Sequence, residues 1–214
     1  MNTNRRSFLK RSAVSTFAAA SALHFPFIAK AQSPNSKLNL VSIGVNGRAA
    51  ENLSGVKSEN IVALADVDAN SLEGALKKFP GARTYRDFRV MLEKEADRID
   101  AVIVSTPDHT HAPAAAMALR MGKHLYCEKP LTHTVHEARV LQQLAREHRC
   151  VTQMGTQIHA GGNYRRVVEL IQSGAIGKVA EVHVWVNVSH SYSGGRFKRA
   201  EAPAHLDWDL WLGP

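Results

Sequence analysis

Cysteine, uninterrupted apolar runs and acidic residues near the N-terminus are scarce in this 214-residue sequence. Two cysteines, Cys127 and Cys150, are too few for the disulfide framework of a small secreted scaffold. The apolar segment near the N-terminus is interrupted by His24 and Pro26, and it is too short for a membrane span. The sequence also has no internal repeat. These absences favour an ordinary globular domain over a disulfide scaffold, a membrane protein or a repeat array.

The positive charge is concentrated at the N-terminal end. Residues 1–31 contain five basic residues and no acid, and they contribute most of the formal net charge of +8. The rest of the chain holds 22 basic against 19 acidic residues, which leaves only +3. A body this mildly basic does not indicate a nucleic-acid partner.

Residues 1–31 have the pattern of a targeting segment. Arg5 and Arg6 precede Phe8 and Leu9, an Ala/Ser-rich run follows, and residues 29–31 form a small-x-small cleavage site. This segment resembles a twin-arginine signal, which implies the twin-arginine export machinery as a partner and a periplasmic location for the folded protein. No cysteine follows the cleavage site, so we expect no lipid anchor and no membrane span in the mature chain.

From residue 37 onward, short apolar runs alternate with helical patterns. Continuous apolar strands alternating with helices predict an α/β fold with a doubly wound parallel sheet of the Rossmann type over residues 37–154. The ligand of such a sheet lies at the carboxyl ends of its strands. The predicted strands are 38–44, 60–66, 83–85, 99–105, 124–127 and 151–154, and the predicted helices are 49–56, 69–79, 87–97, 112–122 and 134–148.

The pattern changes after residue 154. A helix over 163–173 is followed by a long alternating run at 178–190, which predicts a half-exposed strand. One strand cannot form a stable sheet alone. We therefore expect residues 155–214 to be the start of an α+β second domain with a mainly antiparallel sheet, most of which lies outside this sequence.

The turn after the first strand is a variant of the dinucleotide-binding motif. Its glycines are Gly44 and Gly47, while Asn46 stands where the G-x-G-x-x-G pattern has its second glycine. Asn46 departs from the pattern but tolerates a left-handed backbone better than most residues. Arg48 follows and joins these three as a candidate cofactor-binding residue.

Asp66 ends the second strand, 22 residues after Gly44. A carboxylate at this place accepts hydrogen bonds from the adenosine ribose hydroxyls and would repel a 2′-phosphate. NAD is therefore the expected cofactor, in preference to NADP. The alternative role for Asp66 is a helix cap.

Ser105, Thr106 and Pro107 end the fourth strand and are expected to line the cofactor site, together with His109 and His111. With Asp108, the two histidines could instead ligate a metal. No further ligand group converges on them in the sequence, so no metal is expected. Walls of the nicotinamide pocket and a helix cap are the favoured roles.

The fifth strand ends in Glu128, Lys129 and Pro130. With the Gly44 turn, Asp66, "STPDHTHA", "QMGTQIH" and "LDWDLWLGP", this E-K-P sequence resembles the Gfo/Idh/MocA oxidoreductases from residue 37 to 214. The resemblance makes Lys129 the catalytic residue that polarises the reacting oxygen. It places Glu128 on the nicotinamide side, makes Pro130 a turn residue often preceded by a cis bond, and puts Gln157 in the cofactor cleft.

The resemblance implies an exported, NAD-dependent oxidoreductase that acts on a sugar, polyol or similar carbohydrate-like substrate. It also implies homo-oligomers for a full-length form, through the second domain. Family members have a His/Asp acid–base motif in that domain, and residues 155–214 show no match to it. Two alternatives remain open, namely a glycoside-cleaving enzyme that uses NAD transiently and a non-catalytic nucleotide-binding fragment.

The strand order also bears on the cysteines. Cys127 ends one strand, and Cys150 precedes the next, its parallel neighbour. About four residues of strand rise, at roughly 3.3 Å each, separate the two levels. This exceeds the Cα separation of about 7 Å that a disulfide tolerates, so free thiols are predicted.

Overall fold

The computed structural model describes residues 37–185 and 200–213. The chain divides into two units, Met1–Ser36 and Lys37–Pro214, and all described residues belong to the second. The export signal predicted at 1–31 lies outside the described residues. None of the described helices combines the length and the apolar character needed to cross a bilayer.

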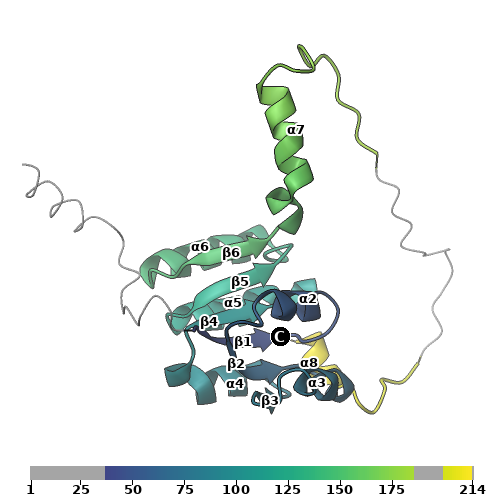
Figure 1. Cartoon of the computed structure of the whole chain (residues 1–214). Coiled ribbons are helices and arrows are strands. Elements are labelled where there is room, and N and C mark those ends of the chain that lie inside the picture. Colours follow the sequence, from purple (N-terminus) through teal and green to yellow (C-terminus); the bar gives the residue numbers. More distant parts are fainter. Residues whose placement is uncertain (1–36, 186–199, 214) are drawn as a thin grey trace, which may run out of the picture. The chain divides into compact units, whose positions relative to one another are not determined.

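A six-stranded parallel sheet forms the centre of the second unit (Figure 1). Its spatial order, β3-β2-β1-β4-β5-β6, is that of a doubly wound dinucleotide-binding sheet, and it confirms the predicted fold class. The chain reverses its winding direction between β1 and β4, and ligands bind at such a switch point. The strands are β1 (Asn39–Ile43), β2 (Asn60–Ala65), β3 (Arg83–Tyr85), β4 (Ala101–Val104), β5 (His124–Glu128) and β6 (Thr152–Gly155).

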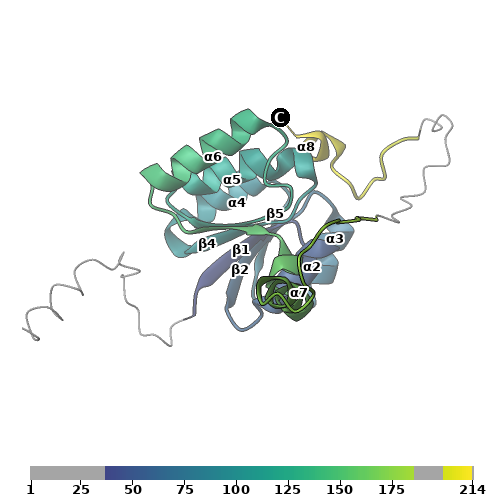
Figure 2. The same cartoon turned by 90° about the horizontal axis from the view of Figure 1, so that it is seen from above.

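Helices cover both faces of the sheet. Figure 2 shows α4, α5 and α6 on one face, with α2 and α3 on the other. These helices are α2 (Arg48–Gly55), α3 (Ala69–Leu76), α4 (Phe88–Glu95), α5 (His111–Arg120) and α6 (Val135–Glu147), and the short 3₁₀ turns η1 (Ala96–Arg98) and η2 (Asp108–Thr110) follow α4 and precede α5. The predicted helices are confirmed, with ends that differ by a few residues.

The strand pattern of alternating side chains produces two hydrophobic clusters. Val41 and Ile43 of β1 belong to the larger cluster, with side chains from α4, α5 and α6. Leu64 of β2 points to the opposite face and packs in the smaller cluster with Leu53 of α2 and Leu72 of α3. Burial on both faces explains why these strands are continuously apolar in the sequence.

Side-chain caps fix where several helices begin. The Asp68 carboxylate accepts hydrogen bonds from the amides of Asn70 and Ser71 at the start of α3. Thr134 and Glu137 form a capping box at the start of α6. Gly122, with φ 70°, follows the end of α5, as its role as a helix stop requires.

The part after β6 contains η3 (Gln157–Ala160), α7 (Gly162–Gln172) and α8 (Trp208–Leu212). The predicted helix over 163–173 is confirmed as α7, and Gly174 follows it with φ 71°. The strand predicted over 178–190 is wrong for residues 178–185, which form no strand, while 186–190 lie outside the described residues. No described segment pairs with 178–185, and a strand without a partner has no ladder of hydrogen bonds to hold it.

Both cysteines are free thiols, as predicted. In the sheet register, Cys127 lies opposite Met154, four positions beyond Cys150. Burial raises the pKa of the Cys127 thiol to about 12 and also raises the pKa of Cys150. Neither thiol is therefore ionised near neutral pH.

Candidate functional site

The first turn lies against the end of β4. The Gly44 amide donates to the Ala65 carbonyl over 2.8 Å, and Gly44 has φ 87°. A Cβ atom added there would lie 2.4 Å from the Ser105 carbonyl oxygen. Only glycine permits this approach, so Gly44 brings the turn after β1 together with the loop after β4.

Asn46 shapes the turn through its side chain. Its Oδ1 accepts a hydrogen bond from the Gly47 amide over 2.8 Å, and its Nδ2 lies 3.4 Å from the Ser71 hydroxyl. The left-handed backbone belongs to Gly47, with φ 54°, and not to Asn46. The turn therefore forms without strain at the position where the motif departs from its usual glycine.

Asp66 connects β2 to the same turn. One carboxylate oxygen accepts from the Val45 amide and the other from the Asp68 amide, each over 3.0 Å. Burial raises the pKa of Asp66, and these amide hydrogen bonds oppose that effect. Each carboxylate oxygen can accept a further hydrogen bond, which a ligand hydroxyl can supply.

A cavity of about 560 Å³ opens at this edge of the sheet. Its volume lies within the range typical of small-molecule sites. The Arg48 side chain is half exposed at its rim and forms an ion pair with Glu51. The predicted residues that line the cavity are Gly44, Asn46, Arg48, Asp66, Ser105, Thr106 and Pro107, and further lining comes from Phe88, Thr110, Leu206, Leu210 and Trp211, among others.

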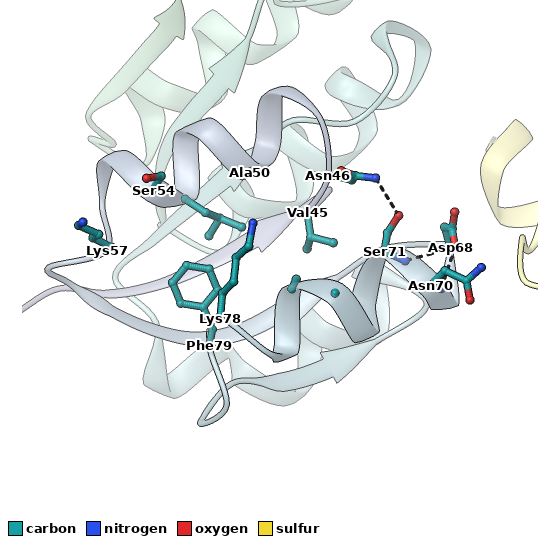
Figure 3. Close-up of a pocket in the computed structure, with 13 residues that line it drawn as sticks. Val45, Asn46, Ala50, Ser54, Lys57, Asp68, Asn70, Ser71, Lys78 and Phe79 are labelled. Carbon is teal, nitrogen blue, oxygen red and sulfur yellow. Dashed lines mark hydrogen bonds between the residues drawn. The ribbon is translucent and has the colours of Figure 1, made fainter.

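A second cavity, of about 650 Å³, lies between α2 and α3 (Figure 3). Asn46, Asp68 and Ser71 line both cavities, so the two adjoin at the Asn46–Ser71 contact marked in Figure 3. Asp66 lines the cavity of about 560 Å³ and does not line the cavity of about 650 Å³. Only the smaller cavity therefore contains the carboxylate that is expected to bind the ribose.

His109 and His111 hold backbone segments together. His111 is buried, with Nδ1 2.6 Å from the Pro130 carbonyl oxygen and Nε2 2.9 Å from the Thr106 carbonyl oxygen. His109 Nε2 lies 2.8 Å from the Trp211 carbonyl oxygen. Neither side chain lines the cavity. The alternative of metal ligation gains no support, because three ring nitrogens already face backbone carbonyls and no group of three or more metal-ligating side chains occurs among the described residues.

Glu128 is a buried carboxylate held by neutral donors. Its Oε1 accepts from Asn52 Nδ2 over 2.8 Å, from the Tyr126 hydroxyl over 3.1 Å and from Gln157 Nε2. Asn52 Nδ2 also donates to the Ser105 hydroxyl over 3.0 Å. A Cβ atom added to Gly155 would lie 2.7 Å from Glu128 Oε1. Glu128 thus fixes the end of β5 relative to α2, β4 and η3.

Lys129 and Pro130 follow at the carboxyl end of β5. The peptide bond between them is cis, as the resemblance implies. Lys129 is exposed, and within the described part of the chain its ammonium forms no ion pair. In the register, Val104 of β4 lies opposite Cys127, so continuing by one and two residues puts Ser105 level with Glu128 and Thr106 level with Lys129.

Several residues at this edge were not among the sequence predictions. Asn52 lies one helical turn after Arg48 on α2, and Tyr126 lies two residues before Glu128 on the same face of β5. These spacings show that Asn52 shares a helix face with Arg48 and that Tyr126 shares a strand face with Glu128. They do not show that α2 and β5 meet at the Glu128 carboxylate, because that contact depends on the fold.

Comparisons with known proteins agree with this geometry. The model of the Gfo/Idh/MocA oxidoreductase family with an NAD-binding Rossmann fold matches residues 38–156. The chain belongs to this family of NAD-binding oxidoreductases. An inositol 2-dehydrogenase from Salmonella paratyphi B is 30% identical over 154 residues, which cover 69% of this chain and 44% of that protein.

Solved structures share the fold. A myo-inositol 2-dehydrogenase from Lactobacillus plantarum matches with a TM-score of 0.63 and 24% identity, over 67% of this chain and 43% of that one. A scyllo-inositol dehydrogenase from Lactobacillus casei, with bound NAD(H) and scyllo-inositol, matches with a TM-score of 0.61 and 23% identity, over 66% and 43% of the two chains. This chain thus spans less than half the length of the relatives that it matches.

Proposed function

We propose that this chain is the nucleotide-binding part of an exported oxidoreductase that transfers a hydride between NAD and a sugar, polyol or related hydroxyl compound. The observation that supports this most directly is the arrangement of one edge of the sheet. The Gly44 turn, Asp66 and the Ser105–Pro107 loop surround a cavity, and the exposed Lys129 follows the neighbouring strand end. Family membership supports the same reaction class.

The residues at this edge suit NAD. The Gly44–Gly47 turn leads into α2, whose N-terminal amides and partial positive charge favour a pyrophosphate. The Asp66 carboxylate retains acceptor capacity for ribose hydroxyls and disfavours the 2′-phosphate of NADP. Glu128, Lys129 and Pro130 are assigned to the nicotinamide side. When bound there, the nicotinamide supplies the hydride acceptor or donor of the reaction.

Lys129 is assigned to the substrate oxygen. In the oxidative direction, a carbinol C–H bond would break as its hydride is taken up by the nicotinamide, and the hydroxyl proton would pass to water as the carbonyl forms. The Lys129 ammonium donates a hydrogen bond to this oxygen and stabilises the negative charge that develops on it. The buried Glu128 network holds the strand end that presents Lys129.

A cyclic polyol is the first substrate class to test. The support is the sequence similarity to inositol 2-dehydrogenase, which covers 69% of this chain. The predicted export signal adds a further element to the proposal. Free NAD is expected to be scarce outside the cytoplasm, so an exported enzyme would retain its nucleotide and regenerate it with a second substrate.

Deuterium transfer tests the proposed reaction. The full-length oxidoreductase, of which this chain is proposed to be the nucleotide-binding part, is incubated with NAD and with myo-inositol deuterated at its carbinol carbons, and the nicotinamide is analysed by mass spectrometry. We expect deuterium in the nicotinamide ring and a rate lowered on the order of 100-fold by Lys129→Met. Lys94→Met, which changes an exposed lysine on α4, serves as the control.

Other outcomes of this assay separate the alternatives. Equal rates for Lys129→Met and the control would remove Lys129 from the reaction. Release of a sugar from a glycoside with no net NADH would favour the glycoside-cleaving alternative. Nucleotide binding with no transfer to any polyol or sugar would favour the non-catalytic alternative.

A further inference from the structure

The segment over residues 203–213 returns to the nucleotide edge of the sheet. Figure 1 shows its helix, α8, in yellow, and Figure 2 shows α8 on the side of the sheet covered by α5. Leu206 forms an isolated antiparallel bridge with Asp68, which follows β2. This bridge places a distant part of the chain against the strand end that presents Asp66.

Backbone hydrogen bonds hold the start of the segment. The Asp207 amide donates to the Val67 carbonyl over 2.9 Å, and the Ala69 amide donates to the His205 carbonyl over 3.0 Å. The Arg86 guanidinium donates to the Val67 carbonyl over 3.0 Å and lies 3.4 Å from the His205 carbonyl oxygen. The segment is therefore joined to the loop after β2 from both sides.

The other end of the segment contacts the loop after β4. The Trp211 carbonyl oxygen lies 2.8 Å from His109 Nε2, and the two rings meet edge to face with centroids 5.2 Å apart. Trp208 stacks on Trp211 at 4.9 Å. Between these attachments, the segment bridges the ends of β2 and β4, the two strands that flank β1.

Three side chains of the segment face the 560 Å³ cavity, namely Leu206, Leu210 and Trp211. Trp208 and Leu212 do not line it, and Leu212 is 49% exposed. Asp66, whose pKa is raised by burial, also lines this cavity. The cavity thus combines a carboxylate with an apolar wall.

We propose that the segment 203–213 forms the wall of the adenine subsite, with Leu206, Leu210 and Trp211 against the base. This inference rests on the proposed binding of NAD. The base is attached to the ribose that Asp66 is assigned to hold, so it must lie within a few ångströms of that carboxylate. A flat, largely apolar base suits a wall of aliphatic and aromatic side chains.

The nicotinamide half does not fit this place. Glu128, Lys129 and Pro130 lie at the end of β5 and do not line the cavity. The cavity of Figure 3 does not suit the base either, because Asp66 does not line it. The wall is therefore assigned to the adenine end of the nucleotide.

Binding of the nucleotide and docking of the segment should strengthen each other. A ligand that contacts the docked segment favours the docked state, and linkage makes this effect reciprocal. Hydrogen exchange of the wild-type chain can report the docking directly. The Asp207 and Ala69 amides are engaged only when the segment is docked, so ADP should slow their exchange.

Calorimetric titration of the full chain with ADP and with NAD tests the wall. Trp211→Ala and Leu206→Ala are expected to weaken both ligands by the same factor, about tenfold. Leu212→Ala is the matched control within the same segment, and Trp185→Ala is the control for loss of an exposed tryptophan. Both controls should bind as the wild type does.

The outcomes separate this inference from the function on which it rests. Normal ADP affinity in Trp211→Ala and Leu206→Ala, or no change in Asp207 and Ala69 exchange on adding ADP, would overturn the wall while leaving NAD binding intact. Failure of the wild-type chain to bind ADP and NAD would overturn the proposed function and the wall together. Folding of each variant is checked by the exchange of β5 and β6 amides, which lie beyond the two strands whose ends the segment bridges.

Discussion

The imidazole ring of His111 shows how a single residue can organise a site without lining it. It bridges the carbonyl groups of Thr106 and Pro130, which follow β4 and β5. Both partners only accept hydrogen bonds, and a neutral imidazole bears hydrogen on one nitrogen, so the ring donates to one carbonyl at a time. The ring therefore lies between the loop after β4, which lines the cavity, and the loop after β5, which is assigned to the nicotinamide side.

Replacing His111 by leucine should destabilise the fold. The variant removes a buried donor and leaves a buried carbonyl group without it, which is expected to lower the free energy of unfolding by about 1–3 kcal/mol. Urea unfolding of the full chain measures the change. His136→Leu, at an exposed position of α6, should have little effect. A loss for His111→Leu no larger than that of this control would contradict the bridging role.

At the scale of residues, the sequence predicted which residues lie at the ligand edge of the sheet better than it predicted their hydrogen-bond partners. Gly44, Asp66 and Lys129 could be placed at one edge of the sheet from the predicted strand ends, because a parallel sheet brings carboxyl ends to one edge. Their roles in binding and catalysis stay predictions. The contacts of Glu128 with Asn52 and Gln157 could not be assigned, since the three residues are far apart in the chain. His111 was expected to line the cofactor site, and only the packed structure shows that its ring faces two backbone carbonyls.

At the scale of elements, the edge strand β3 is tied to α4 by a buried carboxylate. Glu95 of α4 is 2% exposed, and it forms an ion pair with Arg83 and accepts a hydrogen bond from the Tyr85 hydroxyl over 2.6 Å. β3 is only three residues long and has one neighbouring strand. These side-chain contacts therefore supplement a short backbone ladder.

Glu95→Gln should destabilise the protein in a pH-dependent way. The Arg83 guanidinium lowers the pKa of Glu95 from its ordinary value of 4.5. The stabilisation is thus present above that value and is lost as the pH falls through the lowered pKa of the folded state. At pH 7 we expect a loss of about 2 kcal/mol, since Arg83 is partly exposed to solvent.

Unfolding in urea at several pH values between 7 and 3 measures this effect. The difference between the wild type and Glu95→Gln should shrink as the pH falls below 4.5. Glu93→Gln, at an exposed position on the same helix, is the matched control. A difference that stays constant over this pH range would show that the ion pair does not account for the loss.

The elements themselves follow well from the sequence wherever a strand is buried on both faces or a helix has a side-chain cap. The continuous apolar runs of β1, β2 and β4 and the capping box of α6 are examples. The run from 178 shows the limit, because its alternation predicts a strand that residues 178–185 do not form. The alternation of apolar and polar residues predicts which side chains a strand would place on each face. It does not predict a partner strand, and without one the strand does not form.

At the scale of the whole molecule, the twin arginines predict export of a folded protein. Conservative replacement of both Arg5 and Arg6 by lysine preserves the charge and should stop export, because the machinery recognises the arginine pair. Fractionation of a bacterial host that expresses the full chain measures this. Replacing Arg11 by lysine is the control. Equal periplasmic amounts of the double variant and the wild type would contradict twin-arginine export.

The central claim is that this chain binds NAD at the edge formed by Gly44, Asp66 and the loop after β4. Calorimetric titration of the full chain with NAD and with NADP tests it most directly. We predict that NAD binds at least about tenfold more tightly than NADP, because the Asp66 carboxylate accepts ribose hydroxyls and repels a 2′-phosphate. Tighter binding of NADP would contradict the role of Asp66, and no binding of either nucleotide would contradict the site as a whole.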